Sequence, residues 1–357
     1  NYTATMVGYP AVANIADALA KEIPGIDKKL ALEASVHSAS YKPWLVASSE
    51  NPRKLGLMPR YNKYVNEERH IPADEIQKSV SFGLEMAYYD WCIARIATFN
   101  DNDSLAVCFQ DRSKNYMHYF DEGTGFMRGK NSDGSWVTPF NPRFSSHETS
   151  PYVEGNAWQW TWFIPHDIEG LIGLYGDRER FLRKLDTLFN TSSHIEGEDA
   201  SADITGLIGQ YAHGNEPSHH IAFLYTYAGQ PWKTQEIIDT ILHGFYSATP
   251  EGIIGNEDCG QMSAWYILNA IGFYQVAPGK PLYTIGRPLF DRVEIAVGPG
   301  KTFTLVTRNN SAGNRYVQEV YLDGKRQHNL FLHHRDIMNG STLEIVMDSI
   351  PGLNFTL

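Results

Sequence analysis

The feature that most constrains this 357-residue chain is a change of hydrophobic period near residue 280. Up to about residue 275, apolar residues recur every three or four positions, which predicts amphipathic helices. Beyond Pro278, short runs alternate apolar and polar residues, and turn residues such as Asp323 and Gly324 separate them. Such alternation is typical of β-strands, and an Asp-Gly pair between two runs favours a hairpin. The sequence therefore predicts a mainly α chain that ends in a small all-β module.

The helical part contains about nine or ten helices by this pattern. Uneven loops join them, and one loop, 121–153, is long enough to suggest a functional role. Helices in pairs with uneven loops favour an α/α toroid, whose loops converge on a funnel, and a helical bundle is the competing interpretation. The clearest helical patterns cover Ala11–Ile23, Ala73–Phe99, Ser104–Phe120, Asn156–Tyr175, Arg178–Phe189, Ser218–Ala228, Thr234–Phe245 and Met262–Phe273.

Composition narrows the possible partners. The net charge is −11 and basic residues form no cluster, which argues against nucleic acid and anionic membrane surfaces. No apolar run is long enough to span a bilayer and no signal peptide is present. Three cysteines make no disulfide framework, and Cys92 and Cys108 fall in apolar helical patterns that predict core positions. The 8 Trp and 20 Tyr residues fit either a large core or stacking against sugar rings.

Three segments share an unusual composition: Glu154–Trp160, His213–His220 and Gly255–Tyr266. Each places a carboxylate beside Gly and Asn at a predicted junction between a loop and a helix. Glycine allows the backbone to approach a ligand closely. Together the three junctions predict one polar site lined by aromatic side chains.

Two carboxylates in these segments could cleave a glycosidic bond, which requires one acid and one base or nucleophile. Glu154 is the candidate acid, because three nearby tryptophans would raise the pKa of its carboxyl. The alternative places Glu154 near a helix start, where the helix dipole favours an anion. Asp258 is the candidate base, although it could be a first-turn helix acid and Glu257 could be the reactive member of the pair.

Asn215 and Glu216 offer the hard oxygen atoms that Ca²⁺ prefers. The equally weighted alternative is a structural loop without an ion. A zinc site is disfavoured, because the adjacent residues His219 and His220 would point apart on a helix and no H-E-x-x-H pattern occurs.

Taken together, the three segments resemble glycoside hydrolase family 92, the calcium-dependent exo-acting α-mannosidases. The matching stretches are Tyr152–Trp162, Asp203–His220 and Gly255–Phe273, and Tyr283–Ile295 resembles the family's entry to its closing β segment. The resemblance covers most of the chain. The runs His-Gly-Asn-Glu-Pro-Ser-His-His and Gly-Asn-Glu-Asp-Cys-Gly-Gln are the specific signals.

The resemblance implies an N-terminal β-sandwich, an (α/α)₆ barrel and closing β structure. This chain matches the barrel and the tail only. We therefore expect a catalytic toroid over residues 1–280, incomplete at its N-terminal end, and a β module over residues 281–357. The β-sandwich would belong to a preceding domain or a separate chain. The family also implies a periplasmic, cell-surface or secreted location.

The resemblance further implies an inverting single displacement with Glu154 as general acid and Asp258 as general base. Inversion places such carboxyls roughly 6.5–9.5 Å apart. Asn215 and Glu216 match the calcium region, where the ion would hold the 2- and 3-hydroxyls of the terminal mannose. Asn256 stands where many members carry an acid. We expect substrate contacts from Trp158, His213, Asn256 and Glu257.

The predicted function is hydrolysis of terminal α-linked mannose from mannose-containing glycans, as in N-glycan degradation. Two alternatives remain open: another toroid glycosidase, such as a glucosidase, and a non-catalytic carbohydrate-binding protein that kept the pocket but lost turnover. Hydrolysis of α-linked mannobioses with and without chelator discriminates among the three.

Overall fold

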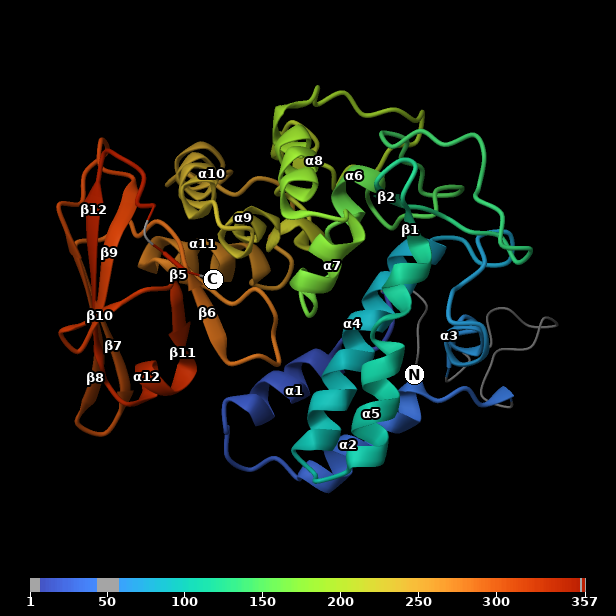
Figure 1. Cartoon of the computed structure of the whole chain (residues 1–357), viewed down its shortest axis with the longest axis horizontal. Helices are drawn as coiled ribbons and strands as arrows, with labels where there is room; N and C mark the ends of the chain where they lie inside the picture. The colour runs from blue at the N-terminus through green and yellow to red at the C-terminus, as the bar shows by residue number, and fades with distance from the viewer. Residues whose placement is uncertain (1–6, 44–57, 354, 357) are drawn as a thin grey trace. The chain divides into compact units, whose positions relative to one another are not determined.

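The computed structural model describes residues 7–43, 58–353, 355 and 356. Contacts divide the chain into two compact units. The first contains residues 1–167 and 192–202, and the second contains residues 168–191 and 203–357. Figure 1 shows the chain with its element labels. Each unit is described separately below.

The first unit is built around the long helix α4 (Ser79–Thr98). Nearly every residue of α4 is buried, and the helix packs against α1, α2 and α5 (Figure 1). Asn102 begins α5 by accepting a hydrogen bond from the Leu105 amide, which satisfies one free donor of the helix end. The other elements are α1 (Ala11–Ala20), α2 (Lys28–Ala39), α3 (Asn62–Glu67), α5 (Asp103–Arg112), the 3₁₀ turn η2 (Asn115–Tyr119), β1 (Phe120–Asp121), β2 (Phe126–Met127) and α6 (Ala157–Trp160).

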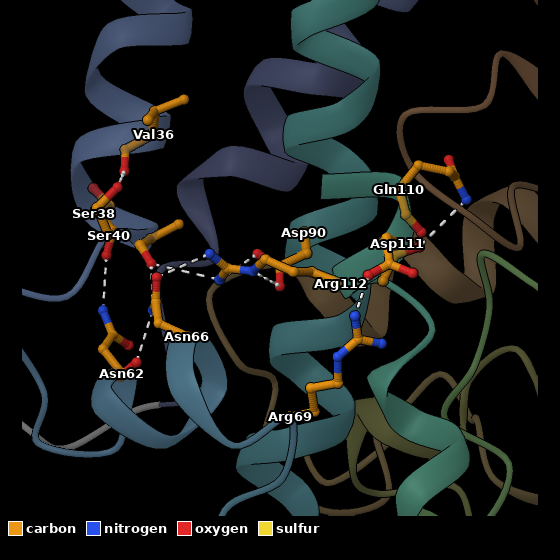
Figure 2. A network of polar contacts seen from close by, with 12 residues as sticks. Val36, Ser38, Ser40, Asn62, Asn66, Arg69, Asp90, Gln110, Asp111 and Arg112 are labelled. Carbon is orange, nitrogen blue, oxygen red and sulfur yellow. Dashed lines mark hydrogen bonds and ion pairs between the residues drawn. The ribbon is translucent and has the colours of Figure 1, made fainter. Parts of the chain in front are cut away.

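A buried ion pair connects the helices of this unit. Arg112, at the end of α5, donates from Nε and Nη2 to the two carboxylate oxygens of Asp90, at 2.9 and 3.0 Å. Its Nη1 donates to Asn66 of α3 at 3.1 Å, and Asn66 donates to the Ala39 carbonyl of α2 at 3.0 Å (Figure 2). The Tyr9 hydroxyl donates to Asp90 at 3.4 Å. One guanidinium thus ties α4 and α5 to the neighbouring helices α2 and α3.

Asp90 is fully buried, and burial raises the pKa of its carboxyl to about 6. The two hydrogen bonds and the positive charge of Arg112 oppose this rise. Burial also lowers the pKa of Arg112, but the charge and hydrogen bonds of Asp90, together with Tyr9 and Cys108, raise it above its ordinary value. The pair is therefore ionised near neutral pH at an energetic cost that its hydrogen bonds only partly offset.

The second unit combines the remaining helices with the C-terminal strands. Gln235 and Glu236 of α10 (Pro231–Gly244) accept hydrogen bonds from the Val317 amide and the Tyr316 hydroxyl of β9 (Tyr316–Leu322). The part of this unit that precedes the C-terminal strands is mainly helical and includes one short hairpin, β3 (Leu207–Ile208) and β4 (Tyr211–Ala212). Its helices and 3₁₀ turns are α7 (Ile168–Leu174), α8 (Arg178–Asn190), η3 (Glu216–Ser218), η4 (Ile221–Phe223), α9 (Leu224–Tyr227), α10 (Pro231–Gly244) and α11 (Gln261–Ile271).

A five-stranded sheet in the order β10-β9-β12-β8-β7 dominates the C-terminal part (red in Figure 1). The last strand, β12, lies in the middle, parallel to β8 and antiparallel to β9. A three-stranded sheet β11-β6-β5 shares the same apolar core. The strands are β5 (Phe273–Tyr274), β6 (Leu282–Ile285), β7 (Arg292–Gly298), β8 (Lys301–Arg308), β9 (Tyr316–Leu322), β10 (Lys325–Gln327), β11 (Phe331–His333) and β12 (Thr342–Asp348), and the short helix α12 (His334–Met338) precedes β12.

The helix-to-strand switch and the predicted hairpin agree with the structure. Asp323 and Gly324 both have positive φ and join β9 to β10. The expected helix over 156–175 is broken into α6 and α7, because Pro165 disfavours helical geometry at the residue before it. Cys92 is buried as expected, whereas Cys108 is exposed because α5 buries only Phe109.

The chain is thus mainly helical with a sheet-rich C-terminal part. The toroid and the boundary at residue 280 stay predictions, although residues 281–357 fall entirely inside the second unit. Among the described helices, none combines the length and apolar character needed to cross a membrane.

Candidate active site

Glu154 lies in a loop of the first unit that is held in place on both sides. The Val153 amide donates to the Ser81 hydroxyl at 2.8 Å, and the Val153 carbonyl accepts from the indole of Trp160 at 2.6 Å. Glu154 is half-buried and has a left-handed backbone with φ of 46°. Such a conformation is costly for a residue with a Cβ and persists only where the surroundings impose it.

The start of α6 does not need the Glu154 carboxylate. Asn156 accepts from the Trp158 amide at 2.9 Å, and Gln159 accepts from the Asn156 amide at 2.7 Å. These two side chains form a capping box that satisfies the free donors of the helix end. The alternative interpretation of Glu154 as a helix-start acid therefore loses its main support.

Trp158 is buried in the first unit, where its ring meets Phe126 edge to face at a centroid distance of 4.7 Å. Trp160 and Trp162 are also buried. These contacts favour a packing role for Trp158. Its predicted contact with substrate stays a prediction.

Asp258 lies in an exposed loop of the second unit, immediately before α11. Asp258 and Cys259 both have left-handed backbones with φ of 54°, and Gly260 follows with φ of 102°. The Asp258 carbonyl accepts from the Gln261 amide at 3.2 Å, so the main chain holds the loop while the carboxylate remains exposed. Three consecutive left-handed residues form a turn that the chain adopts only at a cost.

Glu257, the other member of the acidic pair, serves the helix start. Its carboxylate accepts from the Gly260 amide at 2.5 Å and from the Ser263 amide at 3.4 Å. A hydrogen bond from the Ser263 side chain lowers the pKa of Glu257, and the Gly260 and Ser263 amides add to this effect. The geometry therefore separates two roles that the sequence left open, with Glu257 capping α11 and Asp258 exposed beside it.

Thr205 packs the loops of the second unit closely together. A Cβ on Gly214 would lie 1.9 Å from the Thr205 hydroxyl oxygen, and a Cβ on Gly255 would lie 2.8 Å from it. The Gly214 amide donates to the Thr205 carbonyl at 3.1 Å. Asn256 donates to the Asp203 carboxylate at 3.2 Å. The segments that precede Asn215 and Asp258 are therefore in direct contact, and only glycine fits at both positions.

The predicted calcium residues Asn215 and Glu216 lie in the same cluster of loops. Asn215 is buried, and its amide oxygen accepts from the Glu216 amide at 3.0 Å, while the Glu216 side chain is half-exposed. The Thr205 hydroxyl is buried and lacks a hydrogen-bond partner within the described part of the chain. Amide, carboxylate and hydroxyl oxygens suit a hard cation. No cluster of three or more His, Cys, Asp or Glu side chains that could hold a metal occurs among the described residues.

His213 is fully buried, and both ring nitrogens are used within the protein. Nδ1 lies 2.9 Å from the Tyr211 hydroxyl and Nε2 lies 2.8 Å from the Tyr246 hydroxyl. Tyr246 donates to the Met262 carbonyl at 3.2 Å, so its oxygen accepts from Nε2–H and Tyr211 donates to Nδ1. Burial lowers the pKa of His213 to about 2, with a further contribution from His219. These contacts favour an indirect role, and direct contact with substrate stays a prediction.

The sequence-predicted residues are therefore distributed over both units. Glu154 and Trp158 belong to the first unit, and the six others belong to the second. Thr205, Tyr211 and Tyr246 also belong to these contacts, although no motif in the sequence marks them individually. Thr205 and Tyr211 lie inside the specific run Asp203–His220, but Tyr246 follows a helix and carries no local signal.

With this geometry in place, the chain belongs to glycosyl hydrolase family 92, because the model of that family's catalytic domain matches residues 1–349. It is 38% identical to the family GH92 α-mannosidase BT3965 of Bacteroides thetaiotaomicron, solved in complex with mannoimidazole, with a TM-score of 0.89. That match covers 99% of this chain and 45% of the other. The inverting mannosidase BT2199 of the same organism is 31% identical with a TM-score of 0.85, over 100% of this chain and 49% of its own.

A secreted glycosidase of Arthroderma benhamiae, itself uncharacterized, is 28% identical over 375 residues, which cover 96% of this chain and 45% of that protein. The chain thus spans about half the length of these relatives. The predicted family is confirmed.

Proposed function

We propose that this chain carries the acid and the base of an exo-acting α-mannosidase that inverts the anomeric centre, with Glu154 as acid and Asp258 as base. The observation that carries the proposal is shared by the two residues. Both are held in costly left-handed conformations, while neighbouring side chains perform the helix capping that would otherwise explain a carboxylate there. Costly backbone geometry is frequent at functional sites. The relatives named as mannosidases support the substrate class.

The reaction would proceed in one displacement. Asp258 would take a proton from a water molecule as the water oxygen attacks the anomeric carbon. The bond from that carbon to the leaving oxygen would break as Glu154 donates its proton to the oxygen. The products are β-mannose and the shortened glycan, with Asp258 protonated and Glu154 ionised. Burial lowers the pKa of Lys78, and the nearby carboxylates of Asp199 and Glu154 oppose this change.

A calcium ion, when bound, would hold the 2- and 3-hydroxyls of the terminal mannose and favour a flattened ring. Asn215 and Glu216 would hold it, and the oxygen chemistry of this loop fits such an ion. Thr205 adds a buried hydroxyl beside Gly214.

The deciding experiment compares substrates with different leaving groups in the full-length protein. Glu154→Gln should abolish hydrolysis of natural α-mannosides, because a sugar alkoxide leaves only with a proton. It should affect a dinitrophenyl mannoside far less, because that phenolate leaves unassisted. Equal loss on both substrates would refute the assignment of the acid.

The acidic pair of the second unit offers a matched control. Asp258→Asn should remove turnover, whereas Glu257→Gln changes a neighbouring carboxylate that caps α11 and should leave most of the activity. The reverse outcome would make Glu257 the base.

Two alternatives remain as outcomes of the same assays. Binding of mannosides without turnover by the wild-type protein would support a carbohydrate-binding protein. Preferential cleavage of α-glucosides would support another glycosidase. The proposal extends to mannose-containing glycans as substrates, to an N-terminal β-sandwich domain or chain as partner, and to a periplasmic, cell-surface or secreted location.

A further inference from the structure

Four hydrogen bonds, two of them through Tyr246, connect the loop at 213–219 to the first turns of α11, all within the second unit. Tyr246 bridges His213 Nε2 and the Met262 carbonyl, at 2.8 and 3.2 Å. Gln261 Nε2 lies 3.1 Å from His219 Nδ1. The indole of Trp265 donates to the His219 carbonyl at 3.1 Å. The 213–219 loop carries the candidate calcium residues, and the first turns of α11 directly follow the Asp258 loop.

Tyr246 differs from the other residues that connect the two segments, because its single hydroxyl forms a hydrogen bond to each of them. It comes from neither of them, since it lies just after α10 and pairs with Ile253 in an isolated bridge. Its ring stacks parallel to Trp265 at a centroid distance of 6.1 Å and contacts Tyr266 at 4.8 Å. Packing therefore fixes the ring, and the hydroxyl has one orientation that satisfies both partners.

His213 transmits this contact to the loop. Its ring meets Trp265 edge to face at 4.3 Å, and its carbonyl lies 3.0 Å from His219 Nε2. With both ring nitrogens used and the side chain fully buried, His213 cannot rotate without leaving a buried polar atom unsatisfied. The loop and the start of α11 are thus coupled as one body.

Resting on the proposed function, we propose that Tyr246 is a positioning residue, which sets the place of the Asp258 carboxylate relative to the Asn215–Glu216 loop. The Tyr246 hydroxyl takes no part in the chemistry. It acts through His213 on one side and through the Met262 carbonyl on the other. A small displacement of a base from its productive place can cost on the order of 100-fold in rate.

The test is Tyr246→Phe in the full-length protein, which removes one oxygen and keeps the ring packing. The matched control is Tyr266→Phe, because within the described residues the Tyr266 hydroxyl has no hydrogen-bond partner, although its ring touches Tyr246. We expect kcat on an α-mannobiose to fall about 10–100-fold in Tyr246→Phe with KM changed less than about threefold. The control should retain wild-type values.

Hydrogen exchange provides a readout that does not depend on catalysis. Amides at 213–220 and 254–263 should exchange at least tenfold faster in Tyr246→Phe, while those of β8, β9 and β12 should not change. Gln261→Met, which breaks a second bridge between the same segments, should shift the same amides. Unchanged exchange in both variants, or faster exchange with unaltered kcat, would overturn the proposal. Absence of mannosidase activity in the wild-type protein would refute the proposed function instead, and the exchange experiment would still decide whether Tyr246 couples the two segments.

Discussion

Replacing Arg112 with methionine should destabilise the first unit in a pH-dependent way. Arg112 gives Asp90 two hydrogen bonds and a positive countercharge, and the carboxylate is fully buried. Removing one partner of a buried ion pair typically costs about 3–5 kcal/mol, since the remaining charge is left uncompensated. Methionine has a similar apolar stem, so most of the loss at pH 7.5 should be electrostatic.

The free energy of unfolding of the wild-type protein should already depend on pH in the same direction, but less steeply. Burial raises the pKa of Asp90 from 3.8 to about 6, so the folded state binds more protons than the unfolded chain between these values. The stability from this group is therefore present at low pH and lost as the pH rises through about 6, and lowering the pH from 7.5 to 5.5 should add about 0.8 kcal/mol. In Arg112→Met the folded pKa rises further. If the pKa of Asp90 in the folded variant exceeds 7.5, lowering the pH from 7.5 to 5.5 should restore about 2.7 kcal/mol of stability, because each pH unit contributes about 1.4 kcal/mol.

Urea unfolding at pH 7.5 and 5.5 measures the loss of stability in Arg112→Met and its dependence on pH. Circular dichroism follows the unfolding, and hydrogen exchange of α4 and α5 locates it in the first unit. The control is the double variant Asp90→Asn with Arg112→Met, which has no titrating group at this place and should show no added pH dependence. An Arg112→Met variant that loses less than 1 kcal/mol, or that loses the same amount at both pH values, would refute the reasoning.

Three further predictions concern the second unit, and a fourth concerns the reaction as a whole. Glu257→Ala should lower the urea midpoint of unfolding, because the amides of Gly260 and Ser263 lose an acceptor; an unchanged midpoint would mean that these hydrogen bonds do not stabilise α11. Gly214→Ala should cost at least about 1–3 kcal/mol by collision with Thr205, whereas Gly173→Ala in α7, where a Cβ meets nothing within 4 Å, should be neutral or stabilising in thermal melts. Mannosidase activity should fall with chelator and return with Ca²⁺ but not Zn²⁺; full activity after exhaustive chelation would exclude the ion. Proton NMR should detect β-mannose first, and early α-mannose would indicate retention.

Much of the fold could be predicted from the sequence where the pattern is periodic and local. The strands β7, β8, β9, β11 and β12 coincide with the predicted alternating runs, because side-chain exposure alternates along β7, β12 and most of β8. The helices α2 and α3 were not predicted. The first has weak amphipathic character, since its buried positions include Ser35 and two alanines, and the second has only six residues.

Only those residues of the candidate site that lie within the distinctive sequence segments could be predicted. Glu154 and Asp258 stand in distinctive segments, but the sequence could not decide between Asp258 and Glu257. The structure adds that Glu257, and not Asp258, accepts from the amides of Gly260 and Ser263, which depends on the backbone angles of this turn; the assignment of Asp258 as base stays a prediction. Tyr246 was missed for a related reason, because its partners His213 and Met262 are distant in sequence and the fold alone brings them together.

The central place of β12 has a consequence for how the protein is made. During synthesis β8 and β9 emerge first, and their facing edges must wait for residues 342–348 before they can pair through β12. Until then two apolar strands present open edges to any other nascent chain. A message that stops before the codon for Thr342 would therefore yield a product that aggregates, and a chaperone that shields strand edges should bind nascent chains in which β8 and β9 have left the ribosome but β12 has not. A ribosome-profiling experiment on chaperone-bound nascent chains would reveal that interval.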